Sequence, residues 1–164
     1  MASFDPKLFR QALGKFPTGV TVVTANDSGG APVGVTASSF NSVSIEPPLV
    51  LWSIDKSARS AGAFVNADYF AVNVLTDAQV DVSNRFASRG EDKFGDIGYE
   101  TNSYEVPLLD GCAARFECKT WSVYDGGDHD IIVGEVLAFE CSNERKPLLF
   151  SEGSYGVTAA HPDR

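Results

Sequence analysis

The alternation of apolar and polar positions opens with the pattern of a short amphipathic helix. Over residues 4–16 the apolar side chains recur at the spacing of one helical face, at Leu8, Phe9, Ala12, Leu13 and Phe16. Asp5 is suited to cap this helix, Pro6 fits its first position because no N–H is needed there, and Pro17 ends it. We expect the helix to lie across one end of a sheet or barrel.

Most of the remaining chain carries the pattern of short strands, in which β-branched and aromatic residues form runs between turns. The predicted strands are 19–25, 32–40, 49–54, 69–75, 112–124, 130–141 and 147–150. The turn at 26–30 joins the first two as a hairpin. Short helices are predicted near 60–66 and 77–86, and the polar residues 87–105 predict a long functional or mobile excursion. The pattern therefore predicts a mainly β domain, most simply a closed antiparallel barrel with a few short helices.

Length and charge narrow the function classes. A chain of 164 residues fits one domain, with a core over about 4–156 and a frayed tail at 157–164. A net charge of −9 without any run of Lys or Arg argues against nucleic acid as a partner. We also expect a cytosolic protein without membrane attachment, because neither a leader nor an apolar run of membrane-spanning length is present.

The three cysteines, Cys112, Cys118 and Cys141, do not predict a disulfide framework or a metal centre. Their number is odd, their spacing matches no zinc pattern, and the chain has only two histidines. Cys118 and Cys141 lie in predicted strands, where we expect them to be small buried hydrophobes.

A candidate ligand site begins at residues 34–44, where small and hydroxyl-bearing side chains replace the bulk expected of a core strand. They are Gly34, Thr36, Ala37, Ser38, Ser39, Ser42 and Ser44. Small side chains let a ligand approach the backbone, and N–H and hydroxyl groups provide donors for an anion. A Ser/Thr-rich strand with its polar face in water explains the same pattern, so both interpretations stay open.

A short polar and basic segment at 55–60 precedes a predicted helix, which suits a phosphate group. Arg85 and Arg89 are candidates to converge on the same phosphate, although a solvated loop is the simpler interpretation. Asn73 lies within an apolar strand and needs hydrogen-bond partners, either neighbouring backbone or the polar edge of a ring.

Asp128 and His129 follow two glycines between predicted strands, so the histidine is free to face a cleft, with the aspartate orienting its ring. An ordinary turn pair is the alternative. The chain has no G-x-S-x-G elbow, no phosphate loop and no strand followed by G-x-G-x-x-G. We therefore expect a protein that holds a reactive cofactor rather than one that supplies its own nucleophile.

Five blocks of the sequence together resemble the flavin reductase-like family, the NAD(P)H:flavin oxidoreductases that serve two-component monooxygenases. The blocks are FRQALGKFPTGVTVVTA at 9–25, GVTASSFNSVSIEPPLVL at 34–51, FAVNVL at 70–75, GDHDIIVGEV at 127–136 and LLFSEGSYG at 148–156. The resemblance implies a six-stranded antiparallel split β-barrel of the FMN-binding type with a helix at each opening. It also implies a homodimer with flavin near the interface.

The resemblance further implies three groups of contacts. They are flavin contacts at Thr36, Ala37, Ser38, Ser39, Ser42, Val43, Asn73, Arg85 and Phe86, phosphate contacts at Ser53, Lys56, Ser57 and Ser60, and a nicotinamide pocket at Gly127, Asp128, His129 and Tyr155. The implied reaction is hydride transfer from NADH or NADPH to FMN or FAD, with His129 orienting the nicotinamide. Reduced flavin would then pass to a flavin-dependent monooxygenase.

Two other functions are compatible with the same barrel. One is a flavin-binding or sensing module without turnover, and the other is an oxidase of the pyridoxamine-phosphate type. The Gly127-Asp128-His129 block favours turnover, because a pure binder needs no nicotinamide surface. The oxidase family prefers a more basic phosphate segment than residues 55–60 offer.

Overall fold

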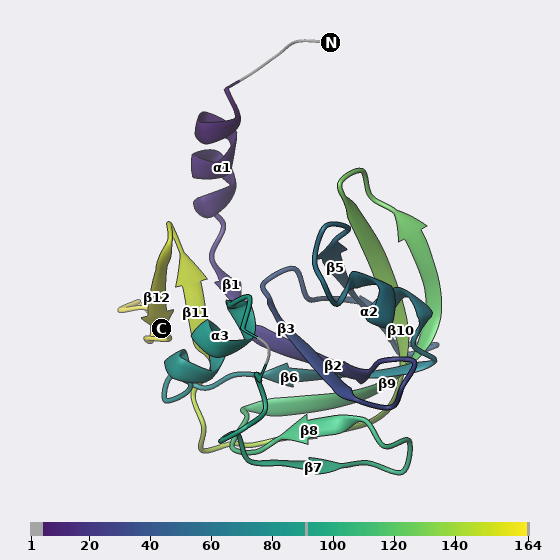
Figure 1. Ribbon diagram of the computed structural model, residues 1–164. Coiled ribbons are helices and arrows are strands. Elements are labelled where there is room, and N and C mark those ends of the chain that lie inside the picture. The colour runs from purple at the N-terminus through teal and green to yellow at the C-terminus, as the bar shows by residue number, and fades with distance from the viewer. Residues whose placement is uncertain (1–4, 91, 164) are drawn as a thin grey trace.

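The computed structural model describes residues 5–90 and 92–163, which form a mainly β fold with few helices (Figure 1). The helices are α1 (Pro6–Gly14), α2 (Ala61–Asn66) and α3 (Val80–Ala87). The strands are β1 (Thr18–Gly19), β2 (Thr21–Asn26), β3 (Pro32–Ala37), β4 (Asn41–Ser44), β5 (Leu49–Asp55), β6 (Tyr69–Val74), β7 (Tyr99–Thr101), β8 (Pro107–Leu109), β9 (Ala114–Asp125), β10 (His129–Cys141), β11 (Leu148–Ser151) and β12 (Ser154–Val157).

One antiparallel sheet of seven strands, in the order β3-β2-β6-β9-β10-β5-β4, carries the fold. The predicted hairpin is confirmed, because β2 and β3 pair around the turn at 26–30. The edge strands of this ladder are β3 and β4, so the seven strands form an open sheet and the closed barrel that the sequence pattern predicted is not shown. The fold is therefore mainly β with few helices, as expected, and the six-stranded split barrel stays a prediction.

Two smaller sheets flank the large one. The strands β1, β11 and β12 form the first, and β7 pairs with β8 in the second. The predicted excursion at 87–105 is thus partly regular, because β7 lies within it. Sequence analysis did not predict β7, because the strand is only three residues long and all three residues are exposed, so no alternation of buried and exposed positions is visible.

The main core lies against the large sheet and is centred on aromatic side chains. Trp52 packs against Phe64 and Phe70, with ring centroids 5.0 and 6.2 Å apart. Gly134 of β10 belongs to this packing, since a Cβ built there would lie 2.4 Å from the Cζ atom of Phe70. The glycine is therefore required by close packing of the core.

Helix α1 begins as predicted, with the side chain of Asp5 accepting a hydrogen bond from the N–H of Lys7 and with Pro6 in the first turn. Its position differs from the prediction. The helix extends away from the sheets (Figure 1), and Leu8, Leu13 and Phe16 are 63%, 57% and 73% exposed. The spacing of apolar residues correctly predicted an amphipathic helix but gave no information about what its apolar face packs against. In the single chain this face is largely exposed.

The structure corrects one expectation about the cysteines. Cys118 is buried as predicted, and so is Cys112, whereas Cys141 at the end of β10 is exposed. None of the three forms a disulfide. Cys141 lies where β10 has an exposed run, so its strand position does not bury it.

These positions predict that one thiol reacts quickly in the folded protein. Burial raises the pKa of Cys112 to about 11 and that of Cys118 to about 12, so both stay protonated and unreactive at neutral pH. Titration with an aromatic disulfide reagent should therefore label Cys141 in the native state and all three thiols after unfolding. Fast labelling of all three native thiols would contradict the burial of Cys112 and Cys118.

No helix in the described part of the chain is long and apolar enough to cross a membrane. The cytosolic location stays a prediction from the sequence.

Candidate functional site

Two neighbouring cavities lie where the turn after β3, the end of β5 and the segment after α3 approach one another. The larger one has a volume of about 720 Å³ and the smaller one about 270 Å³. Val35, Asp55 and Ala58 line both of them, so the two cavities share a wall. We call the larger one the basic cavity and the smaller one the hydroxyl cavity, after the side chains that line them.

The hydroxyl cavity collects much of the segment that the sequence singled out. Its lining includes Thr36–Ser39 from the end of β3, Ser53 from β5, and His129 from the start of β10. Two of the hydroxyls already have protein partners. Thr36 Oγ1 donates to the carbonyl of Ser83 at 2.7 Å, and Ser39 Oγ accepts from the N–H of Ser53 at 2.9 Å. The carbonyl of Ala37 also has a partner, because it accepts from Thr21 Oγ1 at 2.7 Å, so the exposed hydroxyl of Ser38 is the one that we assign to a ligand.

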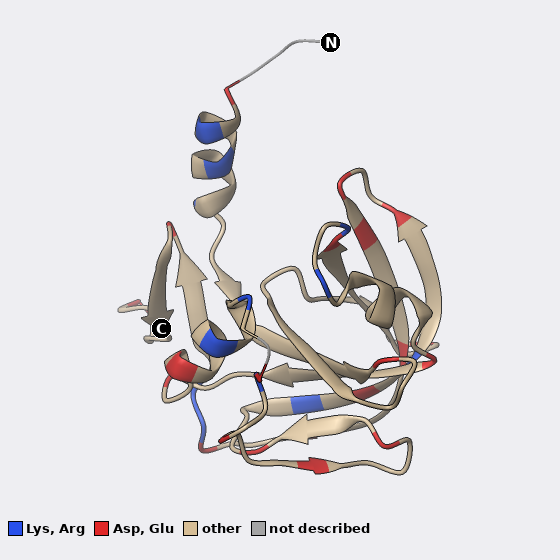
Figure 2. Cartoon of the chain, in the orientation of Figure 1, with Lys and Arg blue, Asp and Glu red and all other residues tan. Residues whose placement is uncertain are grey.

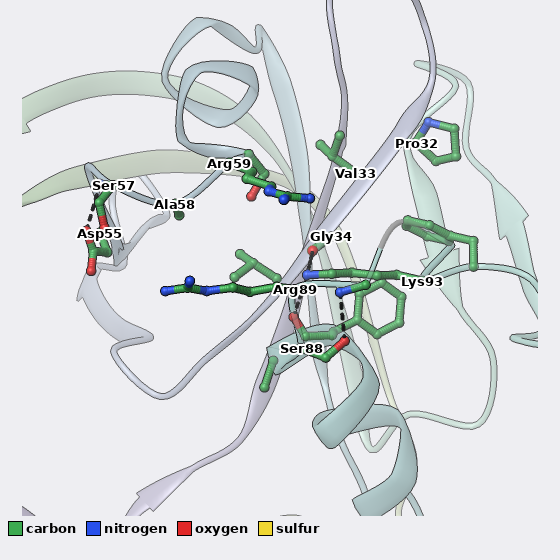
Figure 3. Close-up of a pocket in the computed structure, with 16 residues that line it drawn as sticks. Pro32, Val33, Gly34, Asp55, Ser57, Ala58, Arg59, Ser88, Arg89 and Lys93 are labelled. Atoms are coloured by element: carbon green, nitrogen blue, oxygen red, sulfur yellow. Dashed lines mark hydrogen bonds between the residues drawn. The ribbon is translucent and has the colours of Figure 1, made fainter.

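The basic cavity is lined by three cationic side chains that come from two separate segments. Arg59 precedes α2, and Arg89 and Lys93 follow α3 (Figure 3). Ser57 and Ser60 from the predicted phosphate segment also line it. These cations stand out in a chain with net charge −9, although Figure 2 shows that other basic residues lie on α1 and in the large sheet.

Lys93 lies in the wall of the basic cavity, where its ammonium donates to the Phe86 carbonyl at 2.9 Å and lies 3.4 Å from the Gly34 carbonyl. Burial lowers the pKa of this lysine, because part of the hydration of its charge is lost. In the described residues no carboxylate forms an ion pair with it. An anion in the cavity would restore the stabilisation that water no longer supplies.

Lys56 lines neither cavity and holds the turn before His129. Its ammonium pairs with Asp125 and donates to the carbonyl of Gly127 at 2.7 Å. Its backbone N–H donates to the carbonyl of Asp128 at 3.0 Å. The hydrogen bond to Asp125 raises the pKa of Lys56. The side chain that was expected to contact phosphate therefore positions the neighbouring turn.

The turn between β9 and β10 aims His129 at the hydroxyl cavity. Gly127 adopts a φ of +87°, which a residue with a side chain rarely takes, and His129 pairs with Asp55 across β10 and β5. His129 Nδ1 lies 2.7 Å from a carboxylate oxygen of Asp128. This contact orients the ring and leaves Nε2 as the nitrogen available to a ligand.

Asn73 lies in the core and lines neither cavity. It is completely buried in β6, where its amide nitrogen donates to the carbonyl of Val22 at 2.9 Å and its oxygen accepts from the N–H of Leu109 at 2.9 Å. Of the two interpretations of the sequence, hydrogen bonding to neighbouring backbone is the one that the structure displays. We therefore leave Asn73 out of the ligand contacts that we propose.

Replacing Asn73 with leucine should destabilise the protein without changing ligand affinity. The substitution leaves the buried N–H of Leu109 without an acceptor, which costs about 1–3 kcal/mol. Urea unfolding would show this loss, and a flavin titration of the folded variant should match the wild type. Unchanged stability together with weaker flavin binding would instead make Asn73 a ligand contact.

Several other predicted site residues lie outside the two cavities. Ser42 and Val43 are exposed on β4, and Arg85 is on α3. Tyr155 of β12 donates to the side chain of Asn84 and lies 2.9 Å from the Ser83 hydroxyl, so it anchors α3 to the small sheet. Phe86, by contrast, lines the basic cavity although it is fully buried.

Sequence analysis missed Lys93 and Phe94 as site residues. Both lie in the segment 87–105, which was flagged only as an excursion, and Phe94 packs edge-on against Phe86 with centroids 5.0 Å apart. The only available signal was that a long polar excursion in a small domain is often functional. Among the described residues no cluster of His, Cys, Asp and Glu is arranged to hold a metal ion.

Comparison with known proteins agrees with this picture. Residues 13–159 match the family model of the flavin reductase like domain. The chain is 49% identical over 152 residues to the FMN reductase (NADH) SmoA of Agrobacterium fabrum (strain C58), which covers 93% of this chain and 86% of SmoA. This chain is also 42% identical to the flavin-dependent monooxygenase, reductase subunit HsaB of Rhodococcus jostii (strain RHA1). That alignment covers 99% of this chain and 82% of HsaB.

A solved structure shows the same fold. The NADH:FAD oxidoreductase SgcE6 of Streptomyces globisporus C-1027 is 38% identical, with a TM-score of 0.89 over 99% of this chain and 95% of its own. SgcE6 has also been solved in complex with NAD and FAD fragments.

The match over 13–159 takes in both cavities and the turn at His129, so the chain belongs to the family of flavin reductase like domains. Relatives differ in length, and the chain spans only 49% of one curated relative that is 45% identical to it.

Proposed function

We propose that this chain catalyses NAD(P)H-dependent reduction of a flavin, FMN or FAD, by hydride transfer. The observation that carries the proposal is the pair of adjoining cavities, one lined by hydroxyls and His129 and the other by cations. The names of SmoA and SgcE6 support it, since both state that these relatives use NADH with a flavin.

The residues present fit a flavin on two grounds. The hydroxyl cavity is lined by Thr36–Ser39, and the exposed Ser38 provides a hydroxyl donor for the polar edge of a ring system. Ser57 and Ser60, which line the adjoining basic cavity, provide hydroxyl donors for the phosphate that FMN and FAD share. When bound, flavin supplies the electron-accepting chemistry, so this chain contributes binding, orientation and exclusion of water.

In this proposal His129 orients the nicotinamide. Its ring lines the hydroxyl cavity, and its Nδ1 is fixed by Asp128, so Nε2 is held toward the space that a nicotinamide would enter. Lys56 keeps this turn in place through Asp125 and the carbonyl of Gly127. Catalysis by this chain is then mainly a matter of positioning two reactants.

We propose that the reduced flavin is passed to a partner flavin-dependent monooxygenase, as the name of HsaB indicates for that relative. We also propose a homodimer. The apolar side chains of Leu8 and Leu13 on α1, and of Phe16 just after it, are exposed in the single chain and would be buried by a second copy. Light scattering of the purified protein would test this, and a monomer would refute it.

The six-stranded split barrel also stays a proposal. Strands β3, β2, β6, β9, β10 and β5 follow one another in the large sheet. The hydroxyl of Ser39, just after β3, hydrogen-bonds both the N–H and the carbonyl of Ser53 on β5. These bonds draw the two ends of the six-strand set together, which supports a curled, barrel-like arrangement.

The deciding experiment follows the absorbance of the reduced nicotinamide with purified protein and each pairing of NADH or NADPH with FMN or FAD. Rapid loss that depends on added flavin would support the reductase, and the best pair would identify the substrates. Flavin binding without turnover in any pairing would refute the enzyme and make the chain a flavin-binding module. The absence of both binding and turnover would refute any flavin function.

A further inference from the structure

The basic cavity is larger than one phosphate group requires. At about 720 Å³ it lies within the usual range of about 300–1,000 Å³ for ligand pockets, whereas the hydroxyl cavity, at about 270 Å³, lies just below it. Ser57 and Ser60, the two expected phosphate contacts that line this cavity, both belong to segment 55–60 on one wall. Arg89, Lys93 and Phe94 come from a different segment, after α3, and are not needed to hold that phosphate.

The cations of the two segments face one cavity. In Figure 3 Arg59 and Arg89 extend into it from separate elements, and the ammonium of Lys93 lies beside the Gly34 carbonyl. The carboxylate that lines the cavity, that of Asp55, accepts a hydrogen bond from the N–H of Ser57 at 2.7 Å. Three cations against one carboxylate suit a group with more than one negative charge.

The cavity also offers an apolar surface beside these cations. Phe94 is half-buried and packs edge-on against Phe86 and Tyr99, and Pro32 and Val33 complete this part of the lining. Aromatic and aliphatic walls next to fixed cations are what a nucleotide needs, because its base is a flat ring and its phosphates are anionic.

We infer that Arg59, Arg89 and Lys93 bind the diphosphate of flavin adenine dinucleotide, so that this chain binds FAD more tightly than FMN. The inference rests on the proposed function, because it places the flavin ring in the hydroxyl cavity. The rest of the dinucleotide then continues past Val35 and Ala58, which line both cavities, into the basic cavity. The diphosphate of a nicotinamide dinucleotide is the other source of the same chemistry. FAD is favoured because His129, the proposed nicotinamide contact, lines the hydroxyl cavity and not the basic one.

Direct binding measurements test the inference without any turnover. Trp52 lines the hydroxyl cavity, so quenching of tryptophan fluorescence reports its occupancy by riboflavin, FMN or FAD. We expect the wild type to bind FAD at least about tenfold more tightly than FMN, because charge-assisted hydrogen bonds to the second phosphate are lost with FMN. Equal affinity for the two flavins would overturn the inference.

Two substitutions test whether these cations cause the tighter binding of FAD. Arg89→Gln and Lys93→Met should each raise the Kd of FAD about tenfold and leave that of FMN nearly unchanged. Arg89 is exposed, so its replacement should not disturb folding, whereas Lys93 also bonds backbone carbonyls. Lys119→Met removes one charge from an exposed position on β9 outside the cavity and serves as the matched control.

Three outcomes would overturn the inference. An equal loss of FMN and FAD affinity would place the shared phosphate on these cations. An unchanged Kd for both flavins, with a raised KM for NADH, would assign the cavity to the nicotinamide dinucleotide. In both cases the proposed reductase function would stand. Failure of the wild type to bind any flavin would remove the inference and the proposed function together.

Discussion

Replacing His129 with alanine should lower kcat/KM for the reduced nicotinamide by about tenfold or more and leave the affinity for flavin nearly unchanged. The ring lines the hydroxyl cavity, and its orientation is set by the 2.7 Å contact between Nδ1 and Asp128. Removing the ring deletes one oriented hydrogen-bonding group from the lining of the hydroxyl cavity. Loss of such a group costs on the order of 1–2 kcal/mol, which corresponds to the expected factor.

The measurement is a steady-state titration of NADH and NADPH at saturating flavin, together with flavin binding by fluorescence quenching. His161→Ala is the matched control, because His161 is the other histidine and lies exposed near the end of the chain. Unchanged nicotinamide kinetics in the His129 variant would remove His129 from the site. A comparable weakening of flavin binding would move it to the flavin contacts instead.

Replacing Gly34 with alanine should destabilise the fold and weaken flavin binding at once. A Cβ at this position would lie 2.4 Å from Cε1 and 2.6 Å from Cδ1 of Phe86, a ring that is fully buried and lines the basic cavity. The ring must shift, and overpacking of this kind costs about 1–3 kcal/mol. Each kcal/mol lowers the melting temperature of a domain of this size by about 2–4 °C.

Gly19→Ala provides the matched control for this prediction. Gly19 is also a strand glycine, but a Cβ there meets nothing within 4 Å. Thermal unfolding should therefore separate the two variants, with the Gly34 variant melting well below the Gly19 variant. Equal melting temperatures would show that the Phe86 ring relaxes freely and that the packing around it is loose.

The structure also adds a packing reason for the glycine at position 34, which sequence analysis had not considered. A small residue in a strand indicates that another group approaches the backbone closely, and a ligand was one of the two interpretations left open. The structure places the rings of Phe86 and Phe94 there instead. Because these rings lie some 50 residues further along the chain, only the packing of α3 against β3 could identify them.

Sequence analysis did not predict the hydrogen-bond partners of the polar residues that it selected. Thr36 and Ser39 line the hydroxyl cavity, yet their hydroxyls bond Ser83 and Ser53, so a hydroxyl at a site is not always a free donor. Lys56 was expected to contact phosphate and instead pairs with Asp125 of the neighbouring hairpin. Each of these side chains bonds a residue that is distant in the sequence and close in space, which a local sequence pattern does not record.

By itself the sequence determined the local elements of this protein, because their causes act over a few residues. Asp5 and Pro6 start α1, the turn at 26–30 makes the first hairpin, and the β-branched runs form strands. The sequence blocks also identified the family. The order of strands in the sheet, the open ladder and the exposed face of α1 were decided only by tertiary structure. So was the convergence of Arg59 with Arg89 and Lys93, because it depends on contacts between segments whose sequence patterns carry no record of one another.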